Sequence, residues 1–358
     1  MVVPSYVSIM TNSNRPTLPS RRALLLAGLS VLALVASLFV PLAASADPPS
    51  TAVVVANRGS GDISVIDTKT LSVGNYPLPA LRGGETAEPM YVSHDSRHDR
   101  VLVGDRGSSS IVAFDDETYA VVGSVTVGDG VFHQWLEVNR EQLWVVGDTS
   151  QTVSVVDSSD LSLITTIPLS ADVVADGGKP HDVFVKGNNA FVSVLNLDDG
   201  SGLVIRYSTK TFNETGRIAT GADPHLFVRS SKLYVASQGG HSVSRFHANT
   251  LAPLGAQPIP NAHGLFVTKR NEVFVTNIAG AGDEALWELD GRLTRVTDTA
   301  DTAPTPHNLT VDNRRQLWVT HSGATANQVS VVELTRAGFG ASSSVAVGTN
   351  PFGLAFVG

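Results

Sequence analysis

The 358-residue sequence contains no cysteine. Disulfide bonds, thiolate metal ligands and covalent haem attachment are therefore excluded, and a metal site would need histidine, carboxylate, methionine or backbone oxygen ligands. Charged residues make up only 16% of the chain, and the formal net charge is −8 at pH 7. Because binding to a phosphate backbone needs clustered lysine and arginine, we expect no general nucleic-acid binding.

The sequence also lacks the local motifs of several enzyme classes. It has no Gly-x-Ser-x-Gly elbow, no phosphate-binding loop and no dinucleotide-binding fingerprint. Almost no segment shows a helical hydrophobic period, and short β-rich runs separated by Gly, Ser, Asn and Asp turns are found instead. The sequence therefore predicts an all-β protein whose function is not revealed by a linear motif.

Residues 1–46 are expected to be an export signal and not part of the fold. Arg21 and Arg22 precede an uncharged run over 23–40, and the small residues Ala-Ser-Ala follow at 44–46, which is typical of a cleavage site. An uncleaved anchor helix is the alternative, because this run approaches the length of a membrane span. The arginine pair leaves both Sec and twin-arginine export open. Cleavage would give a secreted or cell-envelope protein with no transmembrane segment and a net charge of −11, because it removes three arginines and no acid.

One unit repeats seven times after residue 50, at intervals of 40 to 48 residues. Its clearest part is a strand of the form Val-Tyr-Val-Thr-Asn. The seven copies lie at 53–57, 101–105, 143–147, 190–194, 233–237, 273–277 and 317–321. Each copy is followed by a polar turn and further short β-type runs, which is typical of a four-stranded antiparallel blade.

In this recurring motif the chain resembles the YVTN-repeat, YncE-like family of β-propellers. The resemblance implies an all-β fold of seven four-stranded antiparallel blades and says little about chemistry. The first unit lacks its own opening strand, and a surplus strand lies at 351–357. Pairing of 351–357 with 53–57 would close the propeller and leave no open sheet edge. We expect one propeller domain over residues 47–358, present as a monomer.

Five of the ten histidines occupy what reads as a single repeat position, at the start of a short apolar strand. They are His133, His181, His225, His263 and His307, and two further copies carry Met90 and Phe352. Because the innermost strand of a propeller blade lines the central channel, these side chains should form an arc at the channel mouth, on the face that carries the irregular loops. Neutral imidazole suits copper, iron and zinc. We therefore predict a transition-metal site that holds copper or iron, with zinc also possible.

The alternative for these histidines is structural, with each imidazole bonded to a backbone carbonyl of a neighbouring blade. Met90 would be a soft ligand if the metal were copper, or else a packing residue. His321 and Asp105 end the second strand of their blades, where they would either orient the imidazoles or cap a turn. His94 and His98 lie in a turn on the opposite, regular face and read as solvated surface.

The arrangement is similar to nitrous oxide reductases, whose copper cluster is held by axial histidines, and to carotenoid-cleaving oxygenases, which hold iron with four. The chain lacks a cysteine-liganded copper domain and is short for the oxygenases, so neither activity is carried over. We predict an exported metalloprotein acting on a small molecule at the loop-bearing face, as an oxidoreductase or lyase. The alternatives are a non-catalytic scaffold for a protein, peptide, glycan or nucleic-acid strand, and a metal-independent lyase or lactonase with a channel histidine as base.

Overall fold

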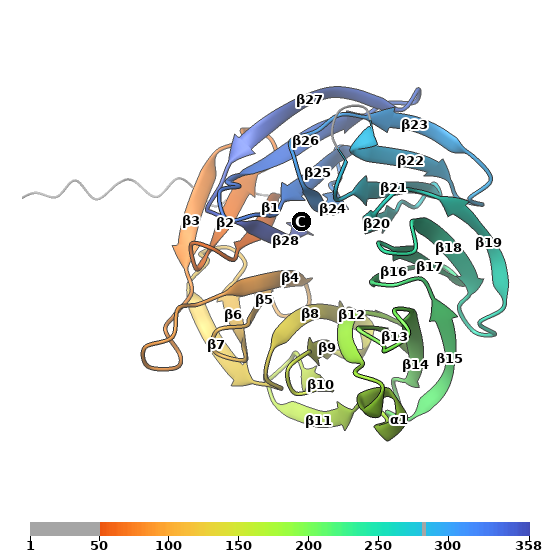
Figure 1. Cartoon of the computed structure of the whole chain (residues 1–358). Helices are drawn as coiled ribbons and strands as arrows, with labels where there is room; N and C mark the ends of the chain where they lie inside the picture. Colours follow the sequence, from red (N-terminus) through yellow and green to blue (C-terminus); the bar gives the residue numbers. More distant parts are fainter. Residues whose placement is uncertain (1–50, 281–283) are drawn as a thin grey trace, which may run out of the picture. The chain divides into compact units, whose positions relative to one another are not determined.

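The computed structural model describes residues 51–280 and 284–358. These residues form seven four-stranded antiparallel sheets that surround a central channel as propeller blades (Figure 1). The predicted seven-bladed all-β fold is confirmed. Within the described residues, no helix is long and apolar enough to cross a membrane.

Each blade runs from an inner strand beside the channel to an outer strand at the rim. The inner strands are β4 (Pro89–Asp95), β8 (Val131–Glu137), β12 (Lys179–Lys186), β16 (Pro224–Arg229), β20 (Ala262–Val267), β24 (Pro306–Val311) and β28 (Pro351–Val357). The second strands are β1 (Ala52–Asn57), β5 (Arg100–Asp105), β9 (Gln142–Gly147), β13 (Asn189–Leu195), β17 (Lys232–Ser237), β21 (Glu272–Asn277) and β25 (Gln316–His321).

The third and fourth strands complete the blades outward. The third strands are β2 (Asp62–Asp67), β6 (Ser110–Asp115), β10 (Thr152–Asp157), β14 (Gly202–Ser208), β18 (Ser242–His247), β22 (Leu286–Asp290) and β26 (Gln328–Leu334). The outer strands are β3 (Val73–Pro77), β7 (Val121–Thr126), β11 (Leu163–Pro168), β15 (Glu214–Thr220), β19 (Pro253–Pro258), β23 (Val296–Ala300) and β27 (Phe339–Ala346). Two short helical turns, η1 (Val138–Arg140) and α1 (Ala171–Ala175), lie in the connections.

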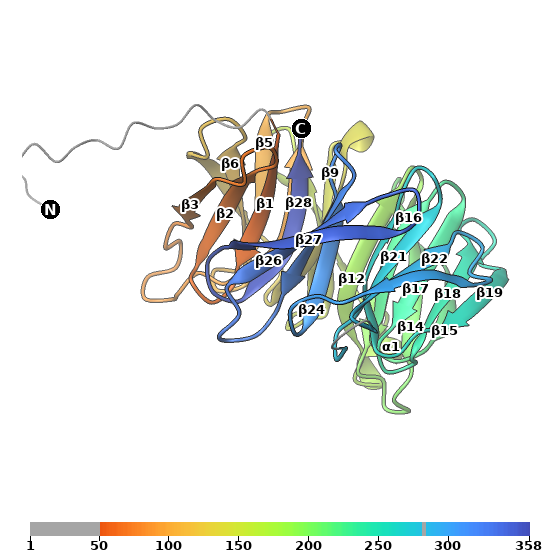
Figure 2. The same cartoon turned by 90° about the horizontal axis from the view of Figure 1, so that it is seen from above.

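The C-terminal strand β28 closes the propeller by completing the blade that β1 begins. The two strands pair antiparallel, with Val357 opposite Ala52 and Pro351 opposite Asn57. Both views show β28 beside β1 (Figures 1 and 2). The closure predicted from the surplus C-terminal strand is therefore confirmed, and β1 is paired on both sides.

The hydrophobic core lies between neighbouring blades. The second strands are buried on both faces, which explains why β1 reads as a continuous apolar run and not as an alternating one. Its residue Val54 packs in one cluster with Val65 of the same blade and Val103 of the next. The outer strands, by contrast, alternate between exposed and half-buried residues, as in β7 and β11. Sheet-on-sheet packing around the channel thus holds the inner strands at fixed positions.

The regular face is built from a repeated tight turn between the third and outer strands. In the first blade the Asp67 carboxylate accepts hydrogen bonds from the backbone N–H groups of Lys69, at 2.8 Å, and Thr70, at 2.6 Å. Leu71 then takes a left-handed conformation with φ of 60°. Aspartate favours such turns because its side chain bonds to the backbone two or three residues further on. The opposite face carries the longer irregular connections, and the inner strands begin there.

Candidate functional site

Strand pairing fixes which residues of the inner strands are equivalent. The inner-strand residues that pair with the last residue of each repeated second-strand motif are Pro89, Val131, Pro180, Pro224, Ala262, Pro306 and Pro351. The next position is therefore held by Met90, Phe132, His181, His225, His263, His307 and Phe352. His133 lies one residue further along, level with Tyr91 and Asp182. The register predicted for His133 is wrong, and Phe132 takes its place beside the four equivalent histidines.

The aromatic side chains at this position form a closed ring of six across the channel. The centroid separations between neighbours are 4.4 Å for Phe132–His181, 4.9 Å for His181–His225, 3.8 Å for His225–His263, 4.5 Å for His263–His307, 4.1 Å for His307–Phe352 and 5.8 Å for Phe352–Phe132. Met90 is fully buried and packs in one cluster with Tyr91 and Phe352. The predicted arc of imidazoles is thus a packed layer, which we call the histidine layer.

Burial keeps the imidazoles of His181, His263 and His307 uncharged at neutral pH. It lowers the pKa of His181 to about 4 and that of His307 to about 3, and the neighbouring His225 adds to both shifts. Burial likewise holds the pKa of His263 well below its usual range. Neutral imidazole is the form that binds a metal ion.

Two members of the histidine layer meet a carboxylate. Asp223 directly precedes β16 in a left-handed conformation, with φ of 54°. Its Oδ1 atom lies 3.1 Å from His181 Nε2 and 3.5 Å from His225 Nε2. Burial raises the pKa of Asp223, but contact with His225 and the other imidazoles outweighs it, and the pKa lies well below the usual value. A carboxylate and two imidazoles are a ligand set typical of iron(II) and zinc.

The three potential ligand atoms lack other partners. One atom each from His181, Asp223 and His225 lies within 4.8 Å of the other two. His181 Nε2, Asp223 Oδ1 and His225 Nε2 are all buried, and none makes a hydrogen bond of acceptable geometry. Leaving a buried polar atom unsatisfied costs about 1–3 kcal/mol. Three such atoms that face one point fit a bound cation, so this group could hold a metal ion. Asp223 is absent from the residues predicted from the sequence.

His133 belongs to a different carboxylate pair. Its Nδ1 atom lies 2.7 Å from Asp182 Oδ1, and Asp182 Oδ2 accepts the backbone N–H of Leu226 at 2.7 Å. The N–H of Val183 approaches the same His133 Nδ1 at the longer distance of 3.3 Å. The contact with Asp182 Oδ1 is short, although its angle is not that of a hydrogen bond. We assign the proton of the neutral ring to Nδ1 because of this short contact, which makes Nε2 a hydrogen-bond acceptor. Although burial raises the pKa of Asp182, the adjacent His133 holds it below the usual value.

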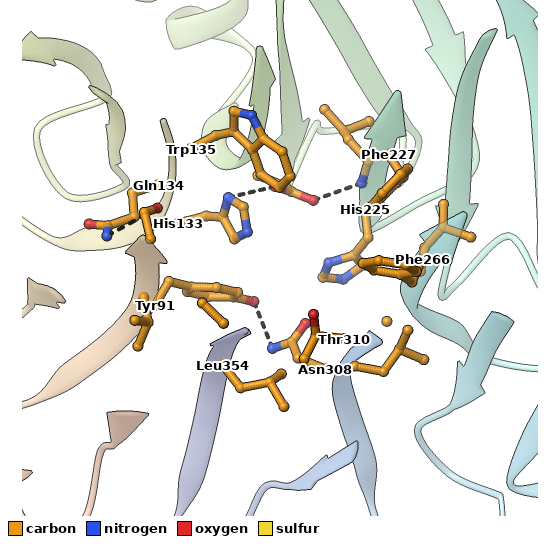
Figure 3. Close-up of a pocket in the computed structure, with 18 of the residues that line it drawn as sticks. Tyr91, His133, Gln134, Trp135, His225, Phe227, Phe266, Asn308, Thr310 and Leu354 are labelled. Atoms are coloured by element: carbon orange, nitrogen blue, oxygen red, sulfur yellow. Dashed lines mark hydrogen bonds and ion pairs between the residues drawn. The ribbon is translucent and has the colours of Figure 1, made fainter. Parts of the chain in front are cut away.

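A cavity of about 400 Å³ lies in the channel below the histidine layer (Figure 3). It extends from the level of His133 to His94, which is near the regular-face end of β4. The residues that border it include Tyr91, His133, Trp135, Asp182, Phe227, Phe266 and Asn308. His225 also borders the cavity, whereas His181 and Asp223 do not line it. The metal-binding group and the cavity are therefore neighbouring features that share His225.

Asp105 and His321 both make the bonds of turn caps. Asp105 Oδ1 accepts the backbone N–H of Glu88 at 2.7 Å and that of Gly107 at 3.1 Å. His321 Nε2 lies 2.8 Å from Ser330 Oγ, and burial lowers the pKa of His321 to about 4. Of the two roles open to these residues, the contacts support capping.

The two histidines of the regular-face turn are not freely solvated. His94 Nε2 lies 2.9 Å from Asp116 Oδ2, and His98 Nδ1 lies 2.9 Å from Asp95 Oδ2. Their side chains are only 14% and 21% exposed. The interpretation as solvated surface is therefore corrected: both imidazoles are paired with carboxylates, and His94 also reaches the cavity.

Comparison with solved structures shows the fold and not the chemistry. The chain is similar to the periplasmic gluconolactonase of Pseudomonas aeruginosa, with 18% identity and a TM-score of 0.67 over 86% of this chain and 99% of that one. It is also similar to a putative 6-phosphogluconolactonase of Bacteroides fragilis, with 15% identity and a TM-score of 0.67 over 86% of this chain and 98% of that one. Hydrazine synthase of Kuenenia stuttgartiensis is similar with 15% identity and a TM-score of 0.60 over 74% of this chain and 88% of that one. No protein-family model and no curated protein matches the sequence. These identities support a shared propeller fold alone.

Proposed function

We propose that the chain is an exported metalloprotein that binds one transition-metal ion through His181, Asp223 and His225. The observation that carries the proposal is the convergence of three buried ligand atoms without other partners. The five-histidine site expected from the sequence is thereby narrowed to two histidines and a carboxylate. Met90 packs away from this group, so the set contains only nitrogen and oxygen, which favours iron(II) or zinc over a thioether-bound copper.

The site has a side that faces solvent. The Asp223 side chain is 31% exposed, whereas those of His181 and His225 are 11% and 6% exposed. Three protein ligands leave further coordination positions for water or substrate. A metal ion held there would act as a Lewis acid or activate a bound water molecule. We therefore propose that the protein acts on a small molecule at the loop-bearing face, where Asp223 and the two imidazoles hold the metal.

The test compares two histidines of the same layer. We expect purified protein to bind about one equivalent of zinc or iron(II) by elemental analysis after dialysis. His225→Phe removes a ligand and should weaken metal binding by at least about tenfold. His263→Phe is the matched control, because it makes the same change beside the group, and it should retain the metal. Phenylalanine is compatible with this layer, since Phe132 and Phe352 occupy it in other blades.

Thermal unfolding provides a second readout of the same test. A ligand that binds only the folded state raises its stability, so zinc should raise the Tm of the wild type and of His263→Phe but not of His225→Phe or Asp223→Asn. Failure of the wild type to bind zinc, iron or copper would overturn the proposal. An equal loss of bound metal in His225→Phe and His263→Phe would overturn the assignment of the ligands. The first result would favour the non-catalytic binding scaffold, and the second a metal site that also uses His263.

A further inference from the structure

The cavity below the histidine layer has one wall made of aromatic faces. Trp135 stacks on Phe184 with a centroid separation of 3.7 Å and an interplanar angle of 27°. The ring centroid of Phe227 lies 6.3 Å from that of Trp135, and the ring centroid of Phe266 lies 5.0 Å from that of Phe227. Trp135, Phe227 and Phe266 come from the inner strands β8, β16 and β20 and all border the cavity (Figure 3). Such a wall suits a planar apolar ring, because aromatic groups attract one another at these separations.

The upper end of the cavity pairs a hydrogen-bond acceptor with a donor. His133 Nε2 is assigned as the acceptor, because the proton of the neutral ring is placed on Nδ1, 2.7 Å from Asp182 Oδ1. The ring of Tyr91 lies edge-on to that of His133, with centroids 4.0 Å apart. Asn308 Nδ2 donates to the Tyr91 hydroxyl oxygen at 3.0 Å, which leaves the Tyr91 proton free to be donated. Burial raises the pKa of Tyr91, so this hydroxyl remains protonated.

We propose that this cavity binds a small aromatic alcohol, a phenol or naphthol in chemical class. Its hydroxyl would donate to His133 Nε2 and accept from Tyr91, while its ring would lie against Trp135 and Phe227. A hydroxyl group fits the end of the cavity because it carries both a donor and an acceptor. The cavity volume, about 400 Å³, lies within the range of small-ligand pockets and accommodates two fused rings.

This binding does not depend on the proposed metal ion. Asp223 and His181 are not among the residues that line the cavity. The ligand would enter from the regular face, because the lining continues to His94, Val311 and Phe356 near the ends of their inner strands. The proposal therefore concerns a second site, on the opposite side of the histidine layer from the exposed edge of Asp223.

Isothermal titration with two matched probes tests the proposal. 2-Naphthol carries the hydroxyl group, and 2-methoxynaphthalene replaces its proton with a methyl group and cannot donate. We expect 2-naphthol to bind the full-length protein at least about tenfold more tightly, the effect of roughly one hydrogen bond. His133→Phe preserves the ring beside Tyr91 but removes the acceptor, so the preference should vanish while the methyl ether still binds.

Three further variants separate the contributions. Trp135→Leu should weaken both probes together, because it removes the aromatic wall but not the acceptor. His247→Phe makes the change used at His133 on the third strand β18, away from the channel, and should leave both affinities unchanged. Asp223→Asn should also leave them unchanged, which distinguishes this site from the metal site. Equal affinities of the two probes for the wild type, an unchanged preference in folded His133→Phe, or no binding of either probe at millimolar concentration would overturn the proposal.

Discussion

Deletion of residues 351–358 is expected to make the protein aggregate. This segment contains β28, whose removal would leave the fully buried strand β1 without its antiparallel partner. It would also uncover the cluster that contains Val53, Val55 and Trp318, against which Leu354 and Phe356 pack. An unpaired apolar strand with free N–H and C=O groups is a template for association with other chains. Size-exclusion chromatography and circular dichroism of the truncated chain would measure the effect.

Strand complementation provides the control for this deletion. A synthetic peptide of residues 350–358 should restore part of the monomer, because it can add the missing inner strand to the edge of β1. A peptide of the same composition in scrambled order should not. A truncated protein that stays monomeric with the wild-type Tm would show that closure by β28 contributes little to stability, contrary to the expectation.

The fold could be predicted from the sequence because its signal is repeated. The second strands are buried on both faces in all seven blades, so each copy keeps the same apolar run, and copies such as 53–57 and 273–277 remain recognisable. The position of the surplus strand at 351–357 then determines the closure. In a propeller each blade contacts mainly its neighbours, so one repeated unit specifies most of the architecture.

The register of the inner strands could not be taken from the histidines alone. In six of these strands the pairing is irregular just after the residue that precedes the histidine position, whereas the pairing of β16 with β17 is continuous. Two residues lie between His181 and Phe184, whereas only one lies between His225 and Phe227. Such a bulge shifts every following side chain relative to the histidine position. Alignment on the aromatic residue, with Trp135 matched to Phe184, would have placed Phe132 and not His133 in the histidine layer.

Asp223 was missed for a related reason. It lies outside the apolar strand, directly before the Pro-His pair of β16. The other blades carry Glu88, Gly130, Lys179, Asn261, Thr305 and Asn350 at this position. Only the turn of the chain before β16, with its positive φ, brings this carboxylate back over two imidazoles from adjacent blades. The local sequence Asp-Pro-His was the available signal. The approach of Asp223 to His181, across the blade boundary, was visible only in three dimensions.

The metal-free protein is expected to lose stability steeply between pH 7 and pH 5. His181, His307 and His321 have folded-state pKa values of about 4, 3 and 4, below the value of about 6.5 in an unfolded chain. As the pH falls below 6.5, the unfolded chain takes up protons that the folded protein cannot, so the free energy of unfolding decreases. Each group contributes about 2 kcal/mol over this interval. His263, whose pKa is also strongly lowered by burial, acts in the same direction.

The aspartates add to acid unfolding only at lower pH. The pKa of Asp223 is lowered in the folded state, so its contribution is complete above the unfolded value near 4 and is lost as the pH falls further. Urea unfolding at pH 7.5, 6.0 and 5.0 in the presence of a chelator would measure the histidine contribution separately. His307→Phe should reduce the loss between pH 7.5 and 5.0 by about 2 kcal/mol, because one buried titrating group is removed. A free energy of unfolding that stays constant over this range would contradict the burial of neutral imidazoles in the histidine layer.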